Sequence, residues 1–67
     1  MLSLSKHAIE NARERGISIA EIKKAVQRGA KHIQDGKVVS DYRHIRVVYK
    51  QINSIHRIIT VMTRFRQ

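Results

Sequence analysis

The sequence predicts one α+β domain over residues 1–67, with two N-terminal helices packed on one face of a three- or four-stranded antiparallel sheet. Apolar residues recur at helical period in the first part of the chain, and from about residue 31 onward β-branched residues alternate with polar ones. Asp35-Gly36 stands between two such runs and suits a two-residue hairpin turn. Because the helices precede a meander of strands, both are expected to cover the same sheet face.

The first helix is expected over about residues 5–15. Ser5 can cap its N-terminus by accepting a hydrogen bond from a free backbone N–H. Ala8, Ile9 and Ala12 form its apolar side. Gly16 follows, and glycine most easily adopts the left-handed conformation that ends a helix.

The second helix is expected over about residues 19–28, and Gly29 ends it. Ser18 and Glu21 have the spacing of a capping box, and Ile17 and Ile22 flank them as a hydrophobic staple. The apolar side consists of Ile19, Ile22, Ala25 and Val26. So few residues separate the two helices that they must form an αα-hairpin or a sharp corner.

The strands are expected at about residues 31–34, 37–42, 44–50 and 55–63, with Asn53-Ser54 as the last turn. The third strand alternates one set of residues, Ile45, Val47 and Tyr49, with a second set, Arg46, Val48 and Lys50. The last strand is the most apolar, so it is expected to be central.

The net charge of +9 is concentrated in the second part of the chain, because residues 43–67 carry six Lys or Arg and no acidic residue. Such a basic surface attracts polyanions, with nucleic acid as the common partner, or an acidic protein. The alternative is a surface that only keeps the protein in solution. A chain of 67 residues is also small enough that we expect a homodimer or a bound partner to stabilise it.

The sequence contains no cysteine, which excludes disulfides and is compatible with a reducing cytoplasm. Its first six residues lack the basic start and apolar core of a signal peptide. No apolar run approaches the roughly 20 residues of a membrane span. We therefore expect a cytoplasmic protein without membrane contact.

Three polar residues of the first helix, His7, Asn11 and Arg15, share one stripe at spacing i, i+4, i+8. Histidine can move a proton near neutral pH, and arginine can hold a phosphate. Metal-free RNA cleavage needs a base for the 2′-hydroxyl and a cation for the phosphorus centre. In the alternative interpretation, His7 simply fills an early-turn position and Arg15 stabilises the helix C-terminus through its dipole.

The strands supply a second set of candidates. Arg46 and Lys50 share one strand face, and Tyr49 and Thr60 add hydroxyl groups. The full set of candidate nucleic-acid contacts is Asn11, Arg43, Arg46, Lys50, Arg57 and Arg64. In the alternative, Tyr49 belongs to the core, the cations form a wet face, and Thr60 is an ordinary strand residue. The four histidines lack close metal-ligand spacings, so we expect no metal and no cofactor.

The segments Ser5-Lys6-His7-Ala8 and Arg13-Glu14-Arg15-Gly16-Ile17-Ser18 resemble the K-H-A…R-G-I-S opening of the domain of unknown function family DUF4258. The second helix, the valine-rich strand around Val47-Val48 and the closing strand with Thr60 are similar too. The resemblance covers roughly residues 5–63.

The resemblance implies a compact helix–sheet domain related by fold analogy to RelE- and BrnT-like toxins and the microbial ribonuclease group. Those toxins cleave RNA without metal and are neutralised by a partner, here an acidic antitoxin. It also implies that His7, Arg15 and Thr60 are the family's recurrent polar residues. Asn11 departs from the arginine expected in many relatives, which removes one cation.

Three hypotheses follow. In the first, the protein is a metal-independent endoribonuclease toxin: His7 is the acid or base, Arg15 with Arg46 or Arg64 stabilises the phosphate, and Tyr49 or Thr60 orients the substrate. In the second, a basic domain grips RNA, DNA or a ribosomal surface without chemistry. In the third, a dimer docks an acidic protein, with the last strand pairing with its copy if that strand lies at a sheet edge.

Overall fold

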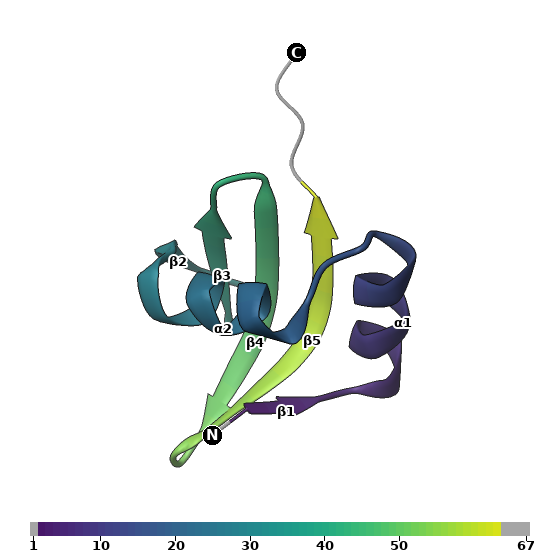
Figure 1. Ribbon diagram of the computed structural model, residues 1–67. Helices are drawn as coiled ribbons and strands as arrows, with labels where there is room; N and C mark the ends of the chain where they lie inside the picture. The colour runs from purple at the N-terminus through teal and green to yellow at the C-terminus, as the bar shows by residue number, and fades with distance from the viewer. Residues whose placement is uncertain (1, 64–67) are drawn as a thin grey trace.

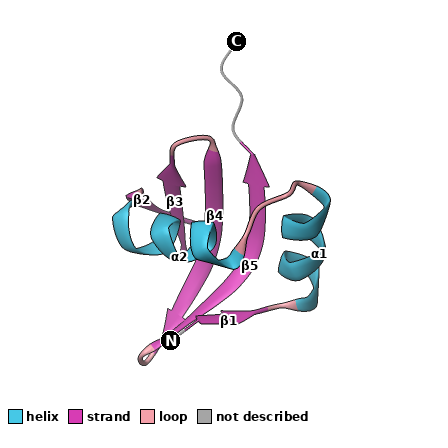
Figure 2. Ribbon diagram, in the orientation of Figure 1, coloured by secondary structure: helices cyan, strands magenta, loops and turns pink. Residues whose placement is uncertain are grey.

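The computed structural model describes residues 2–63 and has an α+β architecture, as predicted (Figures 1 and 2). The two helices are α1 (Lys6–Glu14) and α2 (Ile19–Arg28). The five strands are β1 (Leu2–Leu4), β2 (Ala30–Gln34), β3 (Lys37–Tyr42), β4 (Ile45–Ile52) and β5 (Ile55–Thr63). In Figure 1, α2 lies across the sheet in front of the strands and α1 lies beside β5.

The sheet is mixed and five-stranded, in the order β1-β5-β4-β3-β2, so the expectation of three or four antiparallel strands is wrong. The additional strand is β1, which pairs with β5 in parallel, Leu2 opposite His56 and Leu4 opposite Ile58. All other neighbours are antiparallel. The central strand is β4 rather than β5, and β1 occupies part of the outer edge of β5. A dimer formed by pairing β5 with its copy therefore meets an edge that is already in use.

The caps of both helices are those that the sequence predicts. The Ser5 hydroxyl accepts a hydrogen bond from the Ala8 N–H at 3.1 Å. At α2, Ser18 accepts from the Glu21 N–H at 3.2 Å while the Glu21 carboxylate accepts from the Ser18 N–H at 2.9 Å, which completes the capping box. Gly16, at φ +67°, is left-handed after the end of α1.

The hairpin turn between β2 and β3 is also confirmed. Asp35 and Gly36 both have positive φ, 54° and 74°, as a type I′ turn requires. This two-residue turn fixes the register, so Gln34 pairs with Lys37 and His32 with Val39. Arg43 and Asn53 take the same left-handed conformation in the next two turns.

One core lies between both helices and the sheet. The helices contribute Ala8, Ala12, Ile22, Ala25 and Val26, and the strands contribute Ile45, Val47, Tyr49, Ile58 and Val61. Two residues of the predicted apolar sides lie outside it, because Ile9 is 43% and Ile19 is 52% exposed. The helices therefore contact the sheet through narrow stripes, and the small Ala8 and Ala12 let α1 approach β5 closely.

The C-terminus of α2 meets β3 at a tight contact. Ser40 is fully buried, and its hydroxyl donates a hydrogen bond to the Ala25 carbonyl. Gly29 ends α2, as predicted, but its φ of −69° is one that any residue adopts. A Cβ atom at Gly29 would overlap Ser40 Oγ and the Ala25 carbonyl oxygen. Glycine is therefore required here for space.

Candidate nucleic-acid interface on the uncovered sheet face

The central strand shows that the two faces of the sheet differ. Ile45, Val47 and Tyr49 are 1%, 0% and 3% exposed and pack against the helices. The residues between them point the other way, because side chains alternate along a strand. Among the described residues, neither helix covers this second face, which we call the open face. It includes His32, Gln34, Lys37, Val39, Asp41, Arg46, Val48, Lys50, Arg57, Thr60 and Met62.

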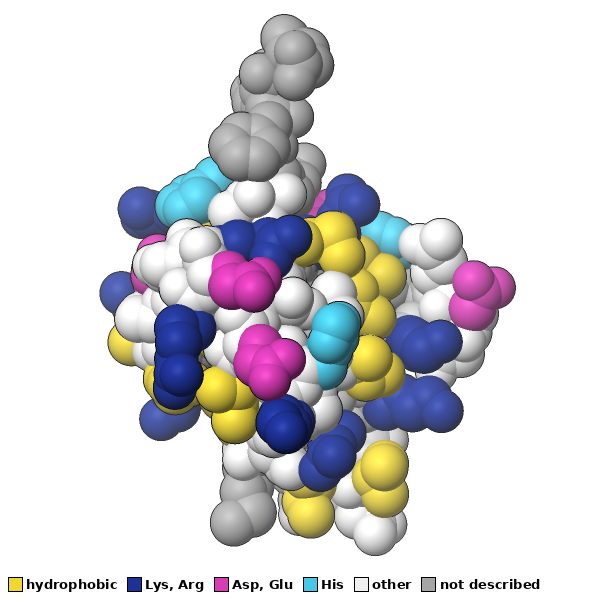
Figure 3. Space-filling model, turned by 90° about the vertical axis from the view of Figure 1, so that its right-hand side faces the viewer, with side chains coloured by type: hydrophobic (Ala, Val, Ile, Leu, Met, Phe, Trp, Pro, Cys, Tyr) yellow, Lys and Arg dark blue, Asp and Glu magenta, His cyan; other side chains and the backbone are white. Residues whose placement is uncertain are grey.

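The strand register brings three of the predicted nucleic-acid contacts together on the open face. Lys50 pairs directly with Arg57, and Arg46 pairs with Met62. Thr60, predicted as a catalytic residue, lies on the same face opposite Val48. On the open face, the positively charged Arg46 and the apolar Met62 therefore lie next to each other. Figure 3 looks onto the α1 side instead, where hydrophobic side chains form a vertical band with Lys and Arg side chains beside it.

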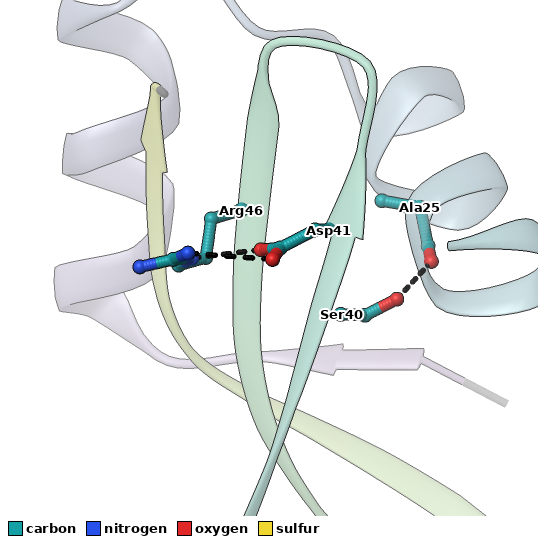
Figure 4. A network of polar contacts seen from close by, with 4 residues as sticks. All are labelled: Ala25, Ser40, Asp41 and Arg46. Atoms are coloured by element: carbon teal, nitrogen blue, oxygen red, sulfur yellow. Dashed lines mark hydrogen bonds and ion pairs between the residues drawn. The ribbon is translucent and has the colours of Figure 1, made fainter. Parts of the chain in front are cut away.

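Arg46 is held in one orientation by Asp41 on the neighbouring strand. Arg46 Nε donates to Asp41 Oδ1 at 2.7 Å, and a terminal nitrogen donates to Oδ2 at 3.3 Å. Two effects of Asp41 raise the pKa of Arg46 above its ordinary value: the larger is the hydrogen bond, and the smaller is the attraction of the carboxylate charge. Figure 4 shows this pair in front of β4, whereas Ser40 points toward Ala25 of α2. The bidentate pair fixes the plane of the guanidinium group.

Beside this pair, the open face is hollowed into a cavity of about 290 Å³. Its apolar lining consists of Val39, Val48 and Met62. Val39 is only 5% exposed although it does not belong to the main core, so it forms a covered floor. Polar groups complete the lining: Gln34, Asp35, Lys37 and Arg46.

The helix stripe lies apart from the open face. His7 and Arg15 are exposed, and Asn11 is half-buried. The Arg15 guanidinium lies 3.9 Å from the Glu14 carboxylate at the end of α1. Within residues 2–63 we find no hydrogen bond or ion pair that joins the stripe to the open face. The structure therefore does not unite the helix and sheet candidates through direct polar contacts.

Tyr49 does not belong to the candidate site. It is 3% exposed, and its ring packs edge-on against His56 with 5.4 Å between ring centroids. Burial raises the pKa of its hydroxyl. The structure therefore places Tyr49 in the core, away from the open face, and its alternation with Ile45 and Val47 in the sequence indicated this position.

Two other predicted contacts also lie off the open face or beyond the described chain. Arg43 sits in the turn between β3 and β4, 5.4 Å from the ring of Tyr42. There it lines a separate cavity of about 130 Å³ together with Glu21 and Lys24 of α2. Arg64 lies outside the described residues.

Several open-face residues were not predicted. Lys37 and Asp41 flank Val39 on β3, and their alternation with Val38 and Ser40 is visible in the sequence. The Asp35-Gly36 turn fixes the partners of β2 and β3, but the partners of β3 and β4 depend on a second turn. Without that register, nothing in the sequence brings Asp41 to Arg46 or Met62 to the cavity.

The described residues hold no group of three or more His, Asp or Glu side chains that would suit a metal ion. None of their helices has the length and apolar character needed to cross a bilayer. The fold and site thus define a small basic α+β domain with an uncovered, cation-bearing sheet face.

The chain belongs to the family described as Domain of unknown function (DUF4258), whose model matches residues 4–63. This confirms the family resemblance of the opening motif. The searches of curated proteins and of solved structures gave no match.

Proposed function

We propose that this protein is an RNA-directed module of a toxin–antitoxin type system and that it binds RNA through the open face. The observation that carries the proposal is the uncovered sheet face on which Lys37, Arg46, Lys50 and Arg57 gather. The net charge of +9 adds long-range attraction for a polyanion. Two helices followed by the antiparallel strands β2 to β5 support the analogy with RelE-type toxins, as does the family resemblance.

The geometry of Lys50 and Arg57 suits a phosphate backbone. These residues pair across neighbouring strands, which lie about 4.8 Å apart. Both side chains are exposed, and Arg57 donates a hydrogen bond to the Ser3 hydroxyl at 3.1 Å. Two adjacent cations can neutralise phosphates and release the counterions that drive RNA binding.

Metal-independent cleavage of the bound RNA is the catalytic form of this proposal. His7 would act as general acid or base and Arg15 would stabilise the phosphate, since both are exposed on one stripe of α1. Thr60 on the open face would position the RNA, and the RNA would pass from that face around the β5 side of the sheet to reach the stripe on α1.

A second candidate function is the docking of an acidic protein, such as an antitoxin. The observation that favours it is the apolar floor of Val39, Val48 and Met62 inside a cationic face. Protein interfaces often combine an apolar centre with a charged rim. We place either activity in the cytoplasm and allow for a homodimer, as for toxin-like proteins of this size.

The test of RNA binding is the salt dependence of affinity for labelled single-stranded RNA, measured by fluorescence anisotropy. In Lys50→Ala/Arg57→Ala, the negative slope of log affinity against log salt should become shallower by about 1.4, because two phosphate contacts are lost. The matched control, Lys24→Ala/Arg28→Ala, removes the same charges from exposed positions of α2. Equal losses in both variants would show that net charge, rather than the open face, sets the affinity.

A further inference from the structure

We propose that the cavity on the open face takes one unpaired nucleobase of a single-stranded RNA, stacked against the guanidinium plane of Arg46. This inference rests on the proposed function and adds the kind of RNA that the face selects. It follows from the shape and lining of the cavity and from the fixed orientation of Arg46.

Arg46 supplies the flat surface. Its contacts of 2.7 Å and 3.3 Å with Asp41 hold the guanidinium in one plane before any ligand arrives. Guanidinium planes stack on nucleobases much as aromatic rings do. The two tyrosines of the chain do not serve here, because Tyr49 is buried and Tyr42 packs against the core on the helix side.

The remaining lining suits a base better than a phosphate. Val39, Val48 and Met62 offer no hydrogen bonds, so a phosphate placed on them would lose its hydration without compensation. At the rim, the Gln34 amide can both donate and accept, and the Asp35 carboxylate can accept from a base N–H. Base edges present such donors and acceptors.

The size of the cavity and its surroundings limit the ligand to a single nucleotide unit. Its volume of about 290 Å³ lies at the lower end for ligand cavities, which suits one small ring system. Lys37 borders the cavity, and Lys50 comes after Val48 on the same face of β4. The register of β3 and β4 places these two lysines across from each other, so a phosphate on that side of the base finds two cations. A duplex keeps its bases stacked and paired, so the open face should prefer single strands.

The test measures RNA affinity for substitutions on which charge attraction and base stacking predict different results. Arg46→Lys keeps the positive charge but removes the plane, and we expect about tenfold weaker binding of a short labelled single-stranded RNA. Binding of the matching duplex should not change. The control is Arg28→Lys on α2, which makes the same exchange away from the open face. Met62→Ala keeps every charge and should also weaken single-strand binding, with folding checked by circular dichroism.

Charge attraction and stacking on Arg46 predict opposite changes in single-strand affinity for the variant Asp41→Asn. It raises the net positive charge, so attraction alone predicts tighter binding. Stacking on a fixed Arg46 predicts weaker binding of the single strand, because the anchor of the guanidinium is lost.

Unchanged single-strand affinity in Arg46→Lys, or equal affinity of the wild type for single strand and duplex, would overturn this inference and leave RNA binding by the open face intact. The absence of any salt-dependent RNA binding by the wild type would overturn the proposed function as well.

Discussion

Replacing Gly29 by alanine tests whether the contact between α2 and β3 is as tight as the structure shows. Gly29 has ordinary extended φ and ψ angles, so backbone strain does not oppose alanine. The new methyl group would instead overlap the buried Ser40 hydroxyl and the Ala25 carbonyl. Either α2 moves away from β3, or Ser40 rotates and loses its hydrogen bond.

The expected magnitude follows from three contributions. Overpacking a tight site costs about 1–3 kcal/mol. Loss of the Ser40 hydrogen bond adds about 1 kcal/mol. Alanine also restricts the unfolded chain, which offsets about 0.4–1 kcal/mol. We expect a net loss of about 1–3 kcal/mol in the free energy of unfolding, and each kcal/mol lowers the melting temperature of so small a domain by about 4–8 °C.

The assay is thermal and urea unfolding of Gly29→Ala, Ser40→Ala and the double variant. Ser40→Ala removes the nearer of the two overlapping oxygens and leaves the Ala25 carbonyl in place. The double variant should therefore lose less stability than the sum of the two single losses, by at least about 0.5 kcal/mol. The control is Gly36→Ala, where a Cβ meets nothing within 4 Å but φ is +74°. The stability that Gly36→Ala loses should be the same with and without Ser40→Ala. Wild-type stability of Gly29→Ala would refute the steric argument, and strict additivity with Ser40→Ala would show that the Ser40 hydroxyl takes no part in the overlap.

Three further predictions concern protonation and catalysis. The backbone and side-chain hydrogen bonds of Ser18 lower the pKa of Glu21, so this carboxylate contributes stability above the pKa of unfolded glutamate. The stability advantage of the wild type over Glu21→Gln should therefore shrink as pH falls through the lowered pKa of the folded state; a constant advantage at all pH values would contradict this. Burial raises the pKa of Tyr49, so the protein should lose stability as pH rises from the unfolded pKa through the folded one. Tyr49→Phe should abolish that part of the alkaline loss in melting experiments, and an unchanged profile would assign the loss to other groups. With EDTA present, the wild type should cleave single-stranded RNA to 2′,3′-cyclic phosphate ends and His7→Ala should be nearly inactive; equal cleavage by both would remove His7 from the mechanism.

The features that the sequence predicts well are those encoded by neighbouring residues. Ser18 and Glu21 carry both halves of their capping box within one helical turn, and Asp35-Gly36 needs only its own backbone angles. The alternation along β4 likewise separates buried Val47 from Arg46 on the open face. In each case the physical cause acts over a few residues.

The features that escape prediction depend on distant parts of the chain. Leu2–Leu4 is too short to show a strand pattern, and its partner residues begin at His56. Ile9 and Ile19 have the right period for burial, but the sheet leaves no partner for them. The cavity requires β2, β3, β4 and β5 in register, so only Arg46 among its lining residues was a candidate from the sequence.

The pairing of β1 with β5 has a consequence for folding. Ser5 donates its backbone N–H to the Ile58 carbonyl at 3.1 Å and its hydroxyl to the Ile59 carbonyl at 3.3 Å, so contacts close a loop of more than fifty residues. Closure over such a distance slows folding and requires the partner strand to be present. During synthesis, β1 can therefore pair and α1 can dock only after β5 has left the ribosome. The hairpins from β2 to β4 can form earlier, and the two ends of the domain are fastened last.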